Sequence, residues 1–76
     1  MSINVLVFAS LSEQLGLSET KLDAASINTA LDVWQALTSQ QADEAVRVAI
    51  NQEYADFSST VKCGDEVAFF PPVTGG

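Results

Sequence analysis

The sequence contains no histidine, one cysteine and only three basic residues among its 76. Without histidine it lacks the commonest general base and the commonest protein metal ligand, so a Ser–His–Asp or Cys–His catalytic arrangement is excluded. The single thiol, Cys63, cannot form an internal disulfide and is too few for a zinc or iron–sulfur centre. The chain by itself is therefore predicted to be neither an enzyme nor a metal protein.

Basic residues are scarce enough to leave a strongly acidic chain, with ten Asp and Glu and a formal net charge of −7. Such a surface repels nucleic-acid phosphates and anionic membranes, which bind through basic contacts. The charge either keeps a small domain soluble or steers it to a protein partner with a basic face. No stretch approaches the ~20 apolar residues of a membrane span, and no Lys or Arg precedes the apolar start, as it would in a secretory signal. We expect a cytoplasmic protein without nucleic-acid or membrane partners.

The hydrophobic content is not low, at 47% of residues, which predicts one compact domain rather than a disordered chain. Alternating apolar residues predict a first strand over 3–9, a polar second strand over 19–24, a third over 46–50 and a last strand over 66–70. Residues 51–53 and 62–65 are expected to form turns. The bulky side chains expected to fill the core are Phe8, Trp34, Tyr54, Phe57, Phe69 and Phe70.

Two helices are predicted between these strands. Ser10, with Glu13 as its capping-box partner, is expected to begin a short helix that ends at Gly16. Thr29 and Asp32 form a second candidate capping box, at the start of the main helix. An apolar stripe at helical spacing follows and ends before a polar stretch, 38–44, in which the helix is expected to fray. The stripe consists of Ala30, Val33, Trp34 and Leu37.

The element order is β-β-α-β-β, with a short helix after the first strand. A crossover through the main helix allows the first and last strands to lie parallel at the centre of the sheet. The expected fold is therefore α+β, a β-grasp with a mixed four- to five-stranded sheet packed on one main helix. We expect a domain over 1–70 and an extended C-terminal tail over 71–76.

The tail carries the remaining chemistry. Pro71 and Pro72 stop the last strand and stiffen the start of the tail, and six extended residues reach roughly 18 Å at ~3.1 Å per residue. Gly75 and Gly76 have no Cβ and can enter a narrow channel. The tail is suited to presenting its terminal carboxylate to another protein, although a frayed terminus is the ordinary alternative. Cys63 lies beside Lys62, but nearby acidic residues oppose activation of its thiol, so we interpret it as a turn residue.

Three segments of the chain carry a family resemblance. They are Val5-Leu6-Val7-Phe8-Ala9 with Glu13 and Gly16, then Val48-Ala49-Ile50-Asn51-Gln52, and the ending Gly64-Asp65-Glu66-Val67-Ala68-Phe69-Phe70-Pro71-Pro72-Val73-Thr74-Gly75-Gly76. Together they resemble the molybdopterin synthase small subunit, a ubiquitin-like sulfur-carrier family. Members often carry an arginine where Ser12 stands here, and residues 38–46 are shorter and more polar than usual. These departures concern surface contacts and leave the ending unchanged.

The resemblance implies a β-grasp fold and a reaction cycle at Gly76. An ATP-dependent adenylating enzyme of the ubiquitin-activating type would activate this carboxylate, and a sulfur donor would convert it to a thiocarboxylate. The tail, Phe70, Pro71, Pro72, Val73, Thr74 and Gly75, would then enter the large synthase subunit, in a heterotetramer. Sulfur would pass there to the pterin precursor of the molybdenum cofactor. The chain itself would bind no cofactor.

Three other functions remain open at this point. A thiamine-thiazole sulfur carrier shares the fold and the Gly-Gly end, but the residues from Phe69 to Thr74 resemble the molybdopterin tail more closely. A ubiquitin-like modifier uses the same adenylate but forms an amide with a lysine of its target. A plain binding module would have an inert tail.

Overall fold

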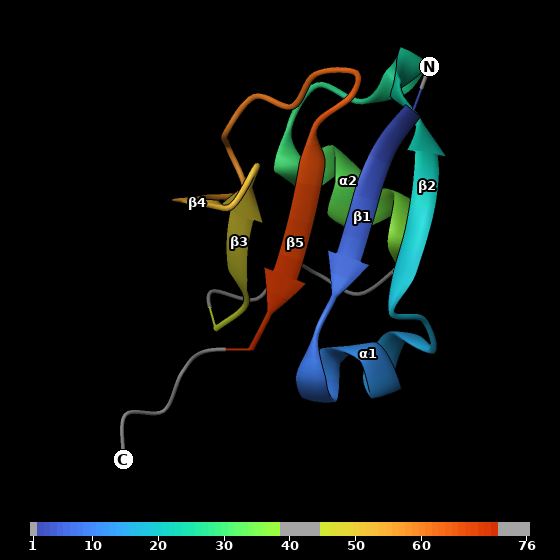
Figure 1. Cartoon of the computed structure of the whole chain (residues 1–76), viewed down its shortest axis with the longest axis vertical. Helices are drawn as coiled ribbons and strands as arrows, with labels where there is room; N and C mark the ends of the chain where they lie inside the picture. Colours follow the sequence, from blue (N-terminus) through green and yellow to red (C-terminus); the bar gives the residue numbers. More distant parts are fainter. Residues whose placement is uncertain (1, 39–44, 72–76) are drawn as a thin grey trace.

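The computed structural model describes residues 2–38 and 45–71, which form a five-stranded sheet with its helices (Figure 1). In chain order the elements are β1 (Ser2–Val7), α1 (Ala9–Leu15), β2 (Glu19–Asp23), the 3₁₀ turn η1 (Ala24–Ser26), α2 (Ala30–Leu37), β3 (Arg47–Ile50), β4 (Glu53–Ala55) and β5 (Glu66–Phe70). The strand order is β2-β1-β5-β3-β4. β1 and β5 pair in parallel at the centre, and the other pairs are antiparallel. The β-grasp prediction is confirmed.

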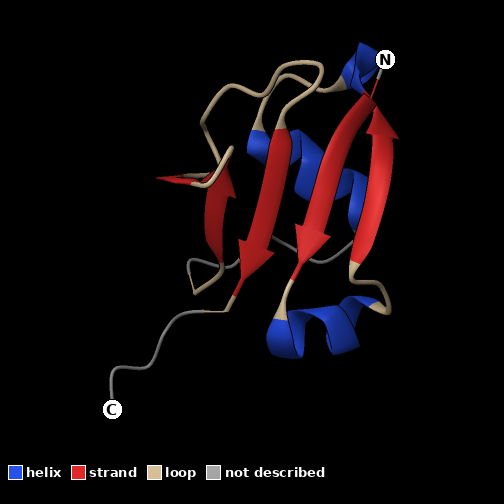
Figure 2. Cartoon of the chain, viewed as in Figure 1, coloured by secondary structure: helices blue, strands red, loops and turns tan. Residues whose placement is uncertain are grey.

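The sheet and α2 form two layers, and α1 lies beyond the end of the sheet where β1 finishes (Figure 2). β1 and β5 run the same way, so Phe70, the last residue of β5, lies at that same end of the sheet. No helix among the described residues is long and apolar enough to cross a membrane.

The core lies between α2 and one face of the sheet, because alternate strand residues point toward the helix. Six such side chains from the three central strands are buried: Ile3, Val5, Val7, Val48, Val67 and Phe69. The predicted core residue Trp34 packs from α2 against Phe57 and Phe69, with ring centroids 6.0 and 5.2 Å away. Val61, which strand alternation did not single out, is also buried.

The predicted capping box at the start of α2 is confirmed. The Thr29 hydroxyl accepts a hydrogen bond from the Asp32 backbone N–H, and the Asp32 carboxylate accepts one from the Thr29 N–H. Asp32 also accepts from the Asn28 N–H, and these bonds hold the pKa of its carboxyl below the usual value. The helix ends at Leu37, and most of the predicted frayed stretch lies outside the described residues.

The predicted start of α1 is wrong. β1 ends at Val7, two residues earlier than expected, and the helix begins at Ala9 after the extended N-cap residue Phe8. The chain turns sharply there, with a φ of 54° at Ala9, so Ser10 lies inside the first helical turn and cannot cap it. The expected end of the helix is confirmed, because Gly16 adopts a left-handed conformation with a φ of 75°.

A short strand, β4, lies where only a turn and a return to the core were predicted. Asn51 and Gln52 both have positive φ angles, 53° and 70°, as a two-residue hairpin loop requires. The turn is therefore completed by two residues, and Glu53 already pairs with Ile50. This pairing places Tyr54 opposite Ala49, on the face of the sheet away from α2, so the prediction of a buried Tyr54 is wrong.

Asp65 joins this hairpin loop to the turn before β5. Its Oδ2 accepts a hydrogen bond from the Lys62 N–H at 2.8 Å, and its Oδ1 accepts one from Asn51 Nδ2 at 3.0 Å. Asn51 Oδ1 in turn accepts from the Glu66 N–H at 3.0 Å. The hydrogen bonds from Asn51 and Lys62 lower the pKa of the Asp65 carboxyl. The predicted 62–65 turn is thereby held against the sheet.

Asp65→Ala is expected to lower the free energy of unfolding at pH 7 by about 1 kcal/mol, because it removes both acceptors from this surface turn. The pKa of Asp65 is lower in the folded chain than in the unfolded one. Its stabilisation is therefore complete above the unfolded pKa of about 3.9 and is lost as the pH falls through the folded value. Urea titrations of both proteins from neutral to acid pH test this. A difference in the free energy of unfolding that is the same at neutral and at acid pH would contradict it.

Candidate functional site

The structure describes only the root of the predicted tail. Phe70 is the last residue of β5 and Pro71 follows it directly. The other predicted tail residues, Pro72, Val73, Thr74, Gly75 and the proposed sulfur-bearing Gly76, lie outside the described residues. Their roles and the domain boundary at residue 70 stay predictions. The described part of the site is therefore the sheet surface that surrounds Phe70.

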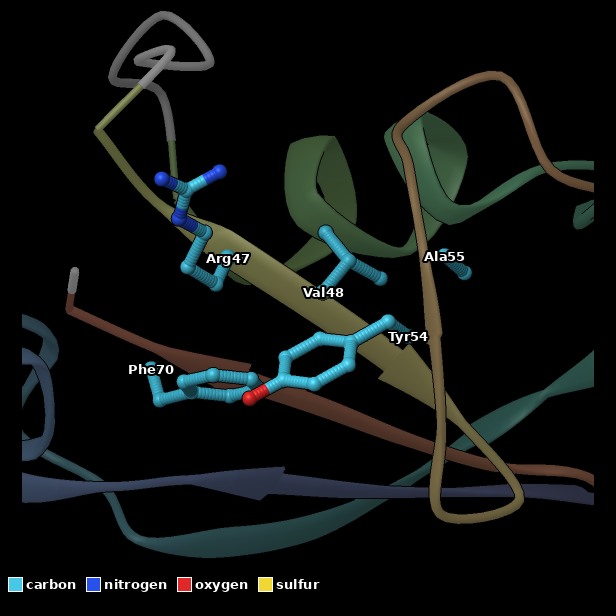
Figure 3. A pocket seen from close by; sticks show the side chains of 5 residues that line it. All are labelled: Arg47, Val48, Tyr54, Ala55 and Phe70. Carbon is cyan, nitrogen blue, oxygen red and sulfur yellow. The ribbon is translucent and has the colours of Figure 1, made fainter. Parts of the chain in front are cut away.

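An aromatic pair lies on the sheet face away from α2, beside the point where β5 ends. Phe69 points into the core, so the next residue, Phe70, points to the opposite face, and the prediction that Phe70 fills the core is wrong. The rings of Tyr54 and Phe70 lie side by side, with centroids 5.9 Å apart and planes inclined by 52° (Figure 3). Tyr54 is 81% exposed, so this contact leaves most of its ring open to solvent.

Phe8 extends this surface across the central strands. It retains an extended backbone after β1, and its N–H donates to the Phe69 carbonyl at 3.0 Å, next to Phe70. The alternation that buries Val7 turns Phe8 to the outer face, where 47% of it is exposed. The prediction that Phe8 fills the core is therefore wrong. We call Phe8, Tyr54 and Phe70 the aromatic patch.

Small or aliphatic side chains lie beside the aromatic patch on the same face of the sheet. Leu6 pairs with Ala68, and Ala68 pairs with Ala49, so these three form a row across the same face. Sequence alternation could have identified Phe8 as outward-facing, since Val5 and Val7 occupy the opposite phase. Tyr54 could not be assigned in this way, because its strand has only three residues.

A hollow of about 390 Å³ adjoins the aromatic patch (Figure 3). It is lined by Arg47, Val48, Tyr54, Ala55 and Phe70. The hollow contains no nucleophile paired with a base. Among the described residues no cluster of His, Cys, Asp or Glu is arranged to hold a metal ion. This surface can bind another protein, but it offers no groups for catalysis.

Cys63 and the carboxylates of Asp56 and Asp65 are not part of the aromatic patch. Cys63 is exposed in the turn that precedes β5, at the opposite end of that strand from Phe70. The carboxylates of Asp56 and Asp65 have lowered pKa values because they accept hydrogen bonds, chiefly from Ser58 and Asn51 respectively. A carboxyl group that serves as a general acid near neutral pH needs the opposite shift.

Comparison with known proteins agrees with this picture. The model of the ThiS family matches residues 5–76. The molybdopterin synthase sulfur carrier subunit of Haemophilus influenzae is 42% identical, in an alignment that covers 97% of this chain and 99% of that protein. The subunit of the same name from Escherichia coli is 38% identical over the same shares of the two chains.

Solved structures with the same fold include SAMP1 and a chain of a molybdopterin-converting factor complex. SAMP1 from Haloferax volcanii superposes over the whole of both chains with a TM-score of 0.80 and 28% identity. A chain in the complex of subunits 1 and 2 of the molybdopterin-converting factor from Helicobacter pylori superposes over the whole of both chains with a TM-score of 0.67 and 21% identity. The second likeness shows the fold alone. The chain belongs to the ThiS family and, within it, to the molybdopterin synthase sulfur carrier subunits.

Proposed function

We propose that this chain carries sulfur as a thiocarboxylate on Gly76 and delivers it to the large subunit of molybdopterin synthase. The observation that carries the proposal is the position of the aromatic patch beside the end of β5, from which the Gly-Gly tail continues. The near-complete alignment with molybdopterin synthase sulfur carrier subunits supports it. A surface that binds a partner at this place aims the tail into that partner's active site.

The chemistry starts from an unreactive group, since a free carboxylate is a poor electrophile. An adenylating enzyme of the ubiquitin-activating type joins the Gly76 carboxylate to AMP and releases pyrophosphate from ATP. The terminal sulfur of a persulfide donor then attacks the carbonyl carbon and displaces AMP. A thiol cleaves the resulting S–S bond, which leaves the thiocarboxylate on Gly76 and a disulfide on the donor side. This chain binds no cofactor in any step.

The chain's own residues supply binding and delivery. Phe8, Tyr54 and Phe70 bury apolar surface against the partner, as aromatic anchors do at many protein interfaces. Pro71 and Pro72 restrict the direction in which the tail leaves the sheet. Val73, Thr74 and Gly75 occupy the channel that leads to the reacting carbon. The large subunit, in a heterotetramer with two copies of this chain, supplies the catalytic groups for transfer to the pterin precursor.

Intact-mass measurement tests the proposal. The chain is incubated with the activating enzyme encoded in its own genome, ATP and a persulfide donor. The expected product is heavier by the difference between one sulfur and one oxygen atom, and fragmentation places the change on Gly76. The loaded protein should then support molybdopterin formation by the large subunit. An unchanged mass, or a loaded protein that supports no product, would overturn the proposal.

Protein modification is a second candidate function, because the similarity to a small archaeal modifier protein covers the whole chain. A modifier shares the adenylate but transfers Gly76 to a lysine amine, forming an amide. Covalent adducts on other proteins, identified in extracts by the Gly-Gly remnant on lysine after digestion, would support this function. A third candidate, the thiamine-thiazole carrier, would show the same mass change on Gly76. It is distinguished by the second step of the test, because a loaded thiazole carrier would not support molybdopterin formation by the large subunit.

Cys63→Ser is expected to leave sulfur loading and delivery unchanged, within about twofold, because the proposed sulfur is bonded to a carboxyl carbon and surface substitutions rarely disturb distant sites. The position of Cys63 at the far end of β5 from Phe70 supports this. Loading and molybdopterin formation are measured on the folded variant. A folded Cys63→Ser protein that fails in either step would show that the thiol takes part.

A further inference from the structure

One basic residue lies beside the proposed docking surface of this otherwise acidic chain, and the proposed docking does not explain its position. Ten acidic residues favour a partner with a basic surface, and electrostatic attraction speeds such an encounter. Yet Arg47, the only arginine in the chain, lies next to the aromatic patch. A partner surface that was basic throughout would repel Arg47 at the place where the two proteins must meet.

Arg47 is part of the same outer face as the aromatic patch. It pairs with Phe70 across β3 and β5, and it lines the hollow together with Tyr54 and Phe70. Its side chain is exposed, and Figure 3 shows the guanidinium turned away from the two aromatic rings. A protein that covers the Tyr54 and Phe70 rings therefore also covers the stem of Arg47 and approaches its charged group.

No acidic side chain in the described part of the chain forms an ion pair with this guanidinium. Asp56 lines an adjoining hollow with Arg47, where its Oδ1 accepts hydrogen bonds from Ser58 and Ser59. Removing an uncompensated charge from water on docking is strongly unfavourable, unless the partner supplies an opposite charge.

We propose that Arg47 is a specificity-determining residue that pairs with an Asp or Glu of the activating enzyme, at the mouth of the channel that takes the tail. The planar guanidinium binds a carboxylate through two parallel hydrogen bonds, so the pair restricts orientation as well as position. The aromatic patch alone is apolar and tolerates rotation of the docked domain. One directional ion pair beside it sets the angle at which the tail enters. This inference rests on the proposed function, because the activating enzyme is the first protein to take the tail.

The test compares two substitutions that make the same change in net charge. Arg47→Glu reverses the charge beside the aromatic patch, and Lys62→Glu reverses an exposed charge in the turn at the other end of β5. Adenylation is followed by ATP–pyrophosphate exchange. We expect Arg47→Glu to reduce kcat/KM by about 100-fold, since breaking a desolvated charge pair has effects of this order. Lys62→Glu should stay within about threefold, because a distant charge acts only through long-range steering.

Three further measurements complete the design. Unfolding midpoints establish that both variants are folded, and Arg47→Gln, which retains a polar side chain without the charge, should give an intermediate loss. An Asp or Glu→Arg substitution at the mouth of the enzyme's channel should restore activity with Arg47→Glu and not with Lys62→Glu. Equal losses for the two charge reversals, or no loss for Arg47→Glu, would overturn the inference. Loading of the wild-type chain distinguishes failure of this inference from failure of the proposed function. A wild-type chain that is not loaded would overturn the proposed function itself.

Discussion

Deletion of Gly76 is expected to abolish thiocarboxylate formation completely. The shortened chain still ends in a carboxylate, but that carboxylate stops one residue short of the adenylating site. A displacement of even about 1 Å at the reacting carbon lowers rates on the order of a hundredfold, and a missing residue shortens an extended chain by about 3 Å. The fold should not change, because the core is built from residues of β1, β3, β5 and α2. Intact mass after incubation with the activating enzyme measures loading.

Gly75→Val provides a graded comparison, because it retains the terminal carboxylate at its proper distance. The branched side chain restricts the backbone and adds bulk in the channel, so loading should be slow rather than absent. The free energy of unfolding of both variants should lie within about 0.5 kcal/mol of the wild-type value, as is usual for surface changes. Normal loading by the chain that lacks Gly76 would contradict the assignment of sulfur to this residue. Normal loading by Gly75→Val would contradict a narrow passage.

Phe69→Ala is expected to lower the free energy of unfolding by about 3–5 kcal/mol, the usual range for removal of a buried phenylalanine. Phe69 is fully buried in the central strand, and its ring packs against Trp34 and Phe57 with centroid distances of 5.2 and 6.0 Å. The free energy of unfolding of a domain of this size is small, so the variant should be largely unfolded at elevated temperature. Denaturant titration, followed by Trp34 fluorescence, measures the loss. A change below about 1 kcal/mol would show that the core is not centred on Phe69.

Phe70→Ala is the matched control, because it removes the same side chain one residue later and on the opposite face of the sheet. Phe70 is only partly buried, and its described ring contact is with the exposed Tyr54. We expect a smaller loss of stability than for Phe69→Ala, together with a tenfold or greater loss of affinity for the partner, as for an interface anchor of about 2 kcal/mol. Titration calorimetry with the activating enzyme measures this. Unchanged affinity would remove Phe70 from the docking surface.

Strands with clear alternation were predictable from the sequence within one or two residues. β5 was predicted with its observed bounds, because Pro71 ends it and a Gly-containing turn precedes it. The capping box of Thr29 and Asp32 was also predictable, since it depends on local hydrogen bonds alone. The start of α1 could not be predicted from the sequence. The sharp change of chain direction at Ala9 follows from the way α1 packs at the end of the sheet and contacts β5.

The three wrongly predicted core residues, Phe8, Tyr54 and Phe70, have the same cause. They are bulky aromatic residues like the buried Phe69, so composition alone assigned all four to the interior. A sheet has two faces, and only one of them is covered by α2. Which face a side chain occupies depends on strand register, and for Tyr54 the register is set by the two-residue hairpin loop that pairs it with Ala49.

By itself the sequence determined the fold class, the absence of a catalytic or metal site built on histidine, and the identity of the Gly-Gly tail. These follow from residue types and local spacing, which do not depend on distant contacts. Only the tertiary structure decided that Phe8, Tyr54 and Phe70 lie on one outer face beside Arg47, although they come from three different strands or strand ends. That surface exists because β1 and β5 pair in parallel, and strand pairing between the two ends of a chain is a property of the folded sheet.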